Sequence, residues 1–185
     1  MMRHAMVIGI LLLIMGCVTQ PNLPVTDARN PSIAQCHWMV SVSGAYLPDA
    51  KCTPGATFTN ATIAEICVSG YSSTVRNVPD SLKNQVYTLY GITNRSSGEY
   101  EIDHLISLQL GGSNDITNLW PEPAAPKPGF HEKDGVENSL KSKMCKNEST
   151  LQDVQMLIAT DWTRALPPQS SQPSTGAAED PEGQP

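Results

Sequence analysis

The sequence predicts one small α+β domain. A segment that is partly apolar at alternate positions, Tyr100–Leu110, runs into a Gly111-Gly112 turn, which is typical of a β-hairpin. Apolar side chains at helical spacing lie before and after this hairpin. Both ends of the 185-residue chain are polar and contain proline, so we expect the domain to span residues 36–165.

Short elements are expected in the N-terminal part of the domain. Cys36–Val42 is suited to a short strand, and Cys52–Gly55 has the composition of a turn. Thr62 and Glu65 have the spacing of a capping box, which predicts a short helix that runs through Cys67.

A longer helix is predicted over Leu82–Tyr90, because its apolar side chains fall on one helical face. Asp80 or Ser81 is expected to cap its first turn. Gly91 stands where such a helix commonly ends.

The second strand of the hairpin is expected over Ile116–Trp120 and to end at Pro121. Residues 121–130 contain four prolines and one glycine, which predicts an irregular loop. A helix is then predicted over His131–Cys145, and a last helix between residues 150 and 162.

The apolar side chains of these last two helices are predicted to be core, together with both tryptophans of this region. Glu137 and Lys141, four residues apart, are expected to form a solvated ion pair. The predicted core positions are Val136, Leu140, Met144, Leu151, Val154, Leu157, Ile158, Trp120 and Trp162.

The N-terminus has the features of an export signal. Ala5–Met15 is an apolar run of about eleven residues, too short to span a bilayer comfortably as a helix. It is followed by Gly16-Cys17, which resembles the lipobox of bacterial lipoproteins. The resemblance implies a signal peptide over residues 1–17, lipidation of Cys17, and an exported protein anchored in a cell-envelope membrane. The alternative is an uncleaved signal anchor with an incidental cysteine.

Two polar segments lie outside the predicted domain, one on each side of it. Residues 18–35 are expected to be a tether between the membrane anchor and the domain. Residues 166–185 are rich in proline, serine, glycine and glutamine and hold almost no large apolar side chains. We expect this tail to be disordered, because it cannot bury enough surface to offset the entropy of ordering.

Four cysteines remain after Cys17, and an even number in an exported chain predicts two disulfides. Three connectivities are possible. Pairing of Cys36 with Cys52 is favoured because both lie in one local segment, which leaves Cys67 with Cys145. A zinc site is the weaker interpretation, since no Cys-x-x-Cys pair occurs.

The charge of the chain does not by itself favour binding to nucleic acid. The net charge is −6, and Glu179, Asp180 and Glu182 supply three of the negative charges near the C-terminus. The remaining body is only mildly acidic. A bound metal ion can still attract phosphate locally.

One carboxylate, two histidines and one asparagine lie in and after the hairpin. Asp103 and His104 stand side by side near the end of the first strand, Asn118 lies in the second, and His131 opens the next helix. Hydrolysis of a phosphodiester needs a base near neutral pH, which a histidine can supply, and a cation that neutralises the developing charge. Because neighbouring strand residues point to opposite faces, Asp103 and His104 must lie at a bend or a strand end.

This stretch, EIDHLISLQLGGSNDITNLWPEP, resembles the HNH nucleases of the ββα-metal superfamily over roughly residues 100–138. The resemblance implies a ββα hairpin-helix core with flanking helices. It implies that Asp103 is a metal ligand, that His104 is the general base, and that Asn118 orients this histidine through its backbone and braces the hairpin.

The resemblance also makes His131 the second metal ligand, with Asp134 as the alternative because the proline-rich loop leaves the helical register open. The wider chain resembles small exported bacterial proteins with an HNH-like core. The matching segments are Cys52–Gly55, Tyr90-Gly91, Asn118–Pro123, Lys133-Asp134 and Asp161-Trp162.

The expected function is therefore that of a metal-dependent endonuclease, a hydrolase that acts outside the cytoplasm. Its cofactor would be one divalent ion, with Mg, Mn, Ni and Zn not distinguished, and its substrate DNA, with RNA as a further candidate. The main alternative is an inactive envelope lipoprotein that uses the HNH-like scaffold for binding. Hydrolysis of another phosphodiester is the third hypothesis.

Overall fold

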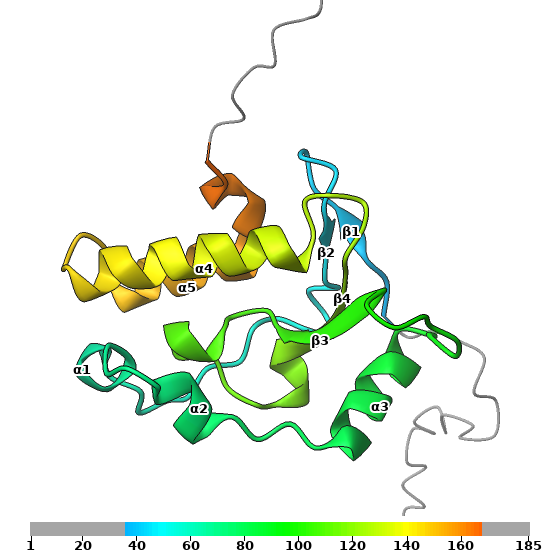
Figure 1. Ribbon diagram of the computed structural model, residues 1–185, viewed down its shortest axis with the longest axis horizontal. Helices are drawn as coiled ribbons and strands as arrows, with labels where there is room; N and C mark the ends of the chain where they lie inside the picture. Colours follow the sequence, from blue (N-terminus) through cyan, green and yellow to red (C-terminus); the bar gives the residue numbers. More distant parts are fainter. Residues whose placement is uncertain (1–35, 168–185) are drawn as a thin grey trace, which may run out of the picture. The chain divides into compact units, whose positions relative to one another are not determined.

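The computed structural model describes residues 36–167 and confirms the α+β class (Figure 1). Cys17, the tether and residues 168–185 of the tail lie outside the described residues. Within residues 36–167, no helix is both long and apolar enough to cross a membrane. The helices are α1 (Ile63–Ile66), α2 (Tyr71–Val75), α3 (Asp80–Leu89), α4 (Phe130–Cys145) and α5 (Leu151–Asp161). The strands are β1 (Met39–Val40), β2 (Tyr46–Leu47), β3 (Tyr100–His104) and β4 (Leu119–Pro123).

The predicted hairpin is present, with different strand limits. β3 and β4 pair antiparallel, with Tyr100 opposite Pro123 and His104 opposite Leu119. The first strand ends at His104 rather than continuing to residue 110, and Leu108–Leu110 form a short 3-10 turn, η1.

The second strand begins later than expected. Residues 116–118 form another 3-10 turn, η2, because the Asp115 carboxylate accepts a hydrogen bond from the Thr117 amide at 2.9 Å. β4 then runs through Pro121 and Pro123, so proline does not end it. Both prolines are tolerated because β4 has only one partner strand in this two-stranded sheet.

The helices before the hairpin follow their capping signals. The Thr62 and Glu65 capping box is formed and opens α1, as predicted. Helix α3 already includes Asp80, and Pro79 occupies the cap position, so neither Asp80 nor Ser81 is the cap. Helix α2 was not predicted, because its five residues have no side-chain cap and no buried face.

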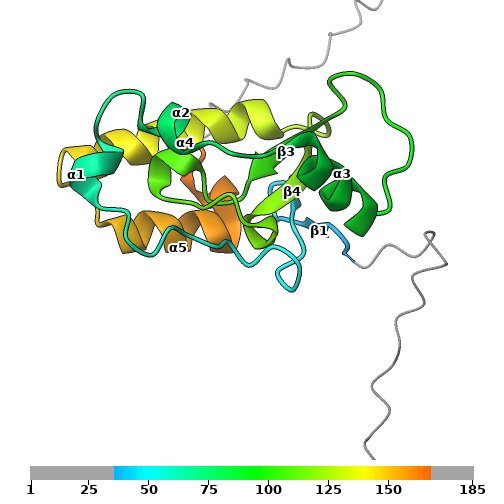
Figure 2. The same cartoon turned by 90° about the horizontal axis from the view of Figure 1, so that it is seen from below.

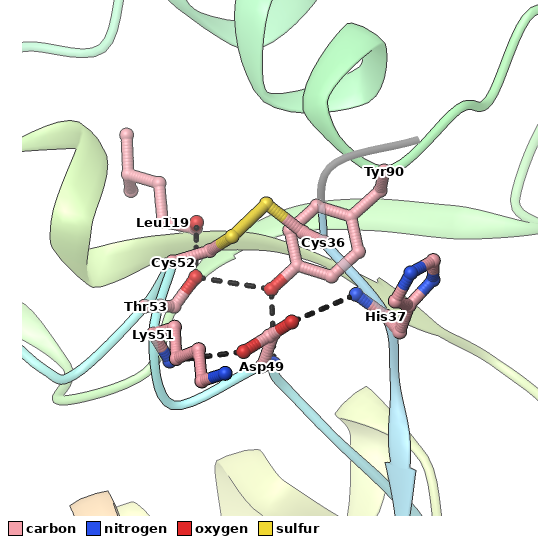
Figure 3. The surroundings of a disulfide bond; sticks show 8 residues. All are labelled: Cys36, His37, Asp49, Lys51, Cys52, Thr53, Tyr90 and Leu119. Carbon is pink, nitrogen blue, oxygen red and sulfur yellow. Dashed lines mark hydrogen bonds between the residues drawn. A yellow bond between two sulfur atoms is a disulfide. The ribbon is translucent and has the colours of Figure 1, made fainter. Parts of the chain in front are cut away.

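A disulfide closes the N-terminal segment on itself, and a chain of hydrogen bonds joins this segment to the hairpin. Cys36 and Cys52 form one of the two predicted disulfides. Beside it, the Asp49 amide donates to the Tyr90 hydroxyl at 3.2 Å, which lies 3.0 Å from the Thr53 hydroxyl (Figure 3). Because Thr53 donates to the Leu119 carbonyl at 3.2 Å, its hydroxyl accepts from Tyr90. These contacts tie the segment to β4.

Helices α4 and α5 lie side by side and supply much of the core (Figures 1 and 2). Their predicted apolar faces are buried, apart from Leu151 and Leu157, which are half-buried. Trp120 and Trp162 are fully buried, as expected. The second predicted disulfide, Cys67–Cys145, joins the end of α1 to the end of α4 across 78 residues of sequence.

We expect the Cys67–Cys145 disulfide to stabilise the domain more than Cys36–Cys52 does. Sequence separations of 78 and 16 residues correspond to losses of unfolded-chain entropy worth roughly 4.5 and 3 kcal/mol. Paired Cys→Ala variants, one for each disulfide, should therefore lose unfolding free energy in this order. Urea denaturation of the two variants measures the difference, and the reverse order would contradict it.

Candidate functional site

A polar cleft of about 240 Å³ lies where the end of β3 meets α2 and α4. The turn η1 lies between these two helices and forms part of its wall (Figure 1). Four carboxylates, one imidazole and one guanidinium line the cleft, so it is suited to charged ligands. The ionisable residues are Arg76, Glu101, Asp103, His104, Asp134 and Glu137.

His104 is held in one orientation by Asn114, which the sequence did not single out. The Asn114 side-chain nitrogen donates to the Val75 carbonyl at 2.7 Å, and its oxygen accepts from the Asn77 amide at 3.1 Å. This amide orientation directs the oxygen toward His104 Nε2, 3.2 Å away. Because that oxygen can only accept, Nε2 carries the ring hydrogen and Nδ1 keeps its lone pair.

The surroundings of His104 favour the neutral imidazole. Burial lowers the pKa of His104 below its ordinary value, and the positive charges of Arg76 and Lys133 act in the same direction. The neighbouring Asp103 carboxylate opposes the shift without reversing it. A neutral, oriented imidazole is the form that accepts a proton from water.

Asp103 faces the same cleft and is ionised. Its side chain is 20% exposed, and its Oδ2 accepts a hydrogen bond from Lys133 Nζ at 2.5 Å. Burial alone would raise the pKa of Asp103, but the Lys133 ammonium holds it below its ordinary value. Asp103 and His104 thus reach one cleft from adjacent positions at the strand end, as their chemistry requires.

Beneath Asp103 lies a buried ionic cluster formed by Lys133, Glu122 and Glu137. Burial would lower the pKa of Lys133, but the surrounding carboxylates raise it well above its ordinary value. Burial raises the pKa of Glu137 to about 7, and it raises the pKa of Glu122 well above its ordinary value, with Lys133 opposing both shifts. Glu122 therefore holds its proton to higher pH than an exposed glutamate does.

Glu137 pairs with Lys133, four residues before it, and not with Lys141 as predicted. The face of helix α4 that carries Lys133 and Glu137 points toward the hairpin, and both of these side chains are buried. The ion pair is therefore part of the protein interior. The sequence contained the i,i+4 spacing, but no local signal showed which face of the helix was buried.

Asn118 braces the turn that follows β3. Its side chain accepts from the Ile106 amide at 2.9 Å and donates to the carbonyls of Ile106 at 2.9 Å and Ser113 at 2.8 Å. The main-chain carbonyl of Asn118 accepts a hydrogen bond from the Leu105 amide. The hydrogen bond that orients the His104 ring is formed with Asn114. A Cβ atom at Gly112 would lie 1.6 Å from the Ile106 carbonyl oxygen, so this turn requires glycine.

His131 does not line the cleft that holds Asp103. It is exposed on the first turn of α4 and borders a separate hollow of about 680 Å³ with Lys143 and Arg164. Because residues two apart on a helix lie about 200° apart, His131 turns away when Lys133 faces the hairpin. Asp134, the alternative ligand, lines the cleft with Asp103.

The donor set in the cleft fits a hard cation better than a zinc-type ion. Asp103 and Asp134 offer carboxylate oxygens, and Mg²⁺ is usually held by one or two carboxylates with water and substrate phosphate. His104 is the one imidazole that lines the cleft in the described part of the chain. Within residues 36–167, no three histidine, cysteine, aspartate or glutamate side chains are grouped to hold a metal ion.

Crowding of negative charge around Asp103 also favours a cation. Partial burial and the charge of Asp103 raise the pKa of Glu101 and the pKa of Asp134 above their ordinary values. A cation in the cleft would relieve this repulsion. Arg76 is the one basic residue lining the cleft among those described, and it is exposed.

A comparison of the chain with known proteins found no relative. No protein-family model matches it, and no curated protein or solved structure is significantly similar to it. The cleft residues and their contacts are therefore the basis for assigning a function.

We expect the contribution of Glu122 and Glu137 to the unfolding free energy to fall as the pH rises from about 5 to about 8. Glu122 and Glu137 keep protons in the folded state that the unfolded chain loses near pH 4.5. Their stabilising contribution is complete below that pH and is lost as the pH rises through the folded pKa values. Glu122→Gln removes one such group at nearly constant size, so the decline should become shallower in urea denaturation across this range.

Glu148→Gln is the matched control for this measurement, because Glu148 is exposed and lies outside the cluster. It should leave the slope unchanged. A Glu122→Gln protein whose stability declines as steeply as that of the unmodified protein would contradict a raised pKa of Glu122.

Proposed function

We propose that the protein is a metal-dependent, HNH-like endonuclease that hydrolyses nucleic-acid phosphodiester bonds outside the cytoplasm. The observation that carries the proposal is the pairing of an oriented, neutral His104 with an ionised Asp103 at one cleft. The hairpin β3–β4 followed by α4 supports a ββα core. DNA is the substrate we favour, with RNA as the second.

The residues of the chain have distinct tasks in this proposal. His104 Nδ1 accepts a proton from the attacking water, because Asn114 occupies Nε2. The exposed guanidinium of Arg76 attracts the phosphate group into a cleft whose carboxylates would otherwise repel it. Asn118 keeps the turn after β3 in place and contacts no substrate.

Asp103 and Asp134 would hold the divalent ion, with Mg²⁺ or Mn²⁺ favoured by their oxygen donors. When bound, such an ion supplies Lewis-acid stabilisation of the phosphate and of the leaving alkoxide. The first-turn residue His131 has no part in this assignment, since it borders a different hollow. Export and lipidation at Cys17 remain predictions from the sequence.

A second candidate function is binding without catalysis, as an envelope lipoprotein with an HNH-like scaffold. The hydrogen bond from Lys133 to Asp103 favours it, because a positive charge already neutralises the expected metal ligand. Metal-dependent cleavage distinguishes the two functions. Hydrolysis of another phosphodiester stays the third possibility and is tested with a small diester substrate.

We expect His104→Ala to lower the rate of plasmid cleavage in Mg²⁺ or Mn²⁺ by about 10²- to 10⁴-fold, because it removes the base. His37→Ala is the matched control, since His37 is exposed and does not line the cleft. EDTA should abolish cleavage by the unmodified protein. Equal rates for the His104→Ala and His37→Ala proteins would sink the assignment of the base.

We expect Asn114→Ala to slow cleavage by about tenfold or more, because His104 loses its fixed orientation and tautomer. Asn114→Asp is the informative companion: it keeps an acceptor for Nε2 but loses the donor to the Val75 carbonyl. The aspartate variant should also move the pH profile of cleavage upward, because its charge favours the protonated imidazole. Rates and pH profiles that match the unmodified protein would contradict the role of Asn114.

A further inference from the structure

Lys133 extends from α4 toward the hairpin and uses all its hydrogen-bond donors there. Its Nζ donates to Asp103 Oδ2 at 2.5 Å, to the main-chain carbonyl of His104 at 2.9 Å, and to Glu137 Oε1. An ammonium group has three hydrogens, so none remains for solvent or substrate. The side chain is 1% exposed. The Asp103 carboxylate is thus shared with an internal cation before any ligand arrives.

Glu122 supplies a second, independent observation at the same centre. It is 1% exposed, and its Oε2 lies 3.7 Å from Lys133 Nζ. Neither of its carboxyl oxygens has a hydrogen-bond partner within residues 36–167. Buried polar groups are normally paired, so an unpartnered carboxyl beside this ammonium indicates that Lys133 does not satisfy every carboxyl group of the centre.

We propose that Lys133 is an internal competitor for the metal ion at Asp103, so that the cleft binds free metal weakly and takes it up together with a phosphodiester. The inference rests on the proposed function, because it concerns the metal of that same site. Lys133 is a positioning residue: it holds Asp103 and the main chain of His104 and touches no substrate.

Electrostatics explains why the two ligands would bind together. A divalent ion that binds Asp103 shares this carboxylate with a full positive charge, and their repulsion is strong where water is largely excluded. A phosphate group brings negative charge into the same cleft and offsets that repulsion. By linkage, the phosphodiester then raises the affinity for the metal as much as the metal raises the affinity for the phosphodiester.

The test is the affinity of the full-length, oxidised protein for Mn²⁺ without nucleic acid, read from the electron paramagnetic resonance signal of free Mn²⁺. We expect Lys133→Met to bind Mn²⁺ about tenfold tighter or more than the unmodified protein. Lys143→Met is the matched control, because it makes the same change of net charge at an exposed position of α4 outside the cleft. It should leave the affinity unchanged.

A second variant guards against misfolding, because Lys133→Met leaves buried carboxylates without a cation. Lys133→Met/Glu137→Gln also neutralises the partner in α4 and keeps Asp103. This double variant should retain the gain in Mn²⁺ affinity, and adding Asp103→Asn to it should remove the gain. Addition of a short DNA duplex should raise the Mn²⁺ affinity of the unmodified protein more than that of the Lys133→Met variants.

Unchanged Mn²⁺ affinity in both Lys133 variants, or an equal gain in Lys143→Met, overturns the inference. The outcome is separable from that for the nuclease activity. If the unmodified protein cleaves DNA and neither Lys133 variant changes the affinity for Mn²⁺, this inference alone is wrong. If the Lys133 variants bind Mn²⁺ more tightly but the unmodified protein does not cleave DNA, the proposed nuclease activity is wrong and Lys133 is still the competitor for the metal ion.

Discussion

The buried ammonium of Lys133 is the interaction on which the geometry of the cleft depends. It joins the side chain of Asp103, the main chain of His104 and Glu137, and so fixes the end of β3 against α4. A buried ion pair contributes little net stability, but loss of one partner leaves an uncompensated charge in the interior. This constraint fixes the position of α4 beside the hairpin. It therefore also determines which side chains of α4 line the cleft.

Two asparagines then hold the turn after β3 and the His104 ring in place beside the helix. Asn118 satisfies three main-chain groups of the turn between the strands, where Gly112 allows a close approach that no side chain could enter. Asn114 lies in the same segment, and its side chain forms hydrogen bonds with both α2 and the His104 ring. The imidazole is consequently oriented by the same loop that closes the hairpin, which keeps its lone pair in a fixed direction.

Local patterns in the sequence predicted the fold class, the capping box of α1, the helices of the core and both disulfides, because each depends on a few neighbouring residues or on export. Asp103 and His104 were also found, since they adjoin a recognisable turn. Lys133 belonged to one of the matching segments, but its role could not be predicted, because its contact with Asp103 spans 30 residues and depends on the register of α4 after a proline-rich loop. For the same reason His131 was selected although it faces another hollow.

The prolines of β4 have a consequence for the behaviour of the molecule in a crowded compartment. Pro121 and Pro123 have no amide hydrogen, and the Pro121 carbonyl already accepts from the Trp38 indole at 3.1 Å. All five residues of β4 are also buried, so a strand from another chain cannot reach this part of the strand. A covered edge of this kind resists strand addition on the β4 side of the two-stranded sheet.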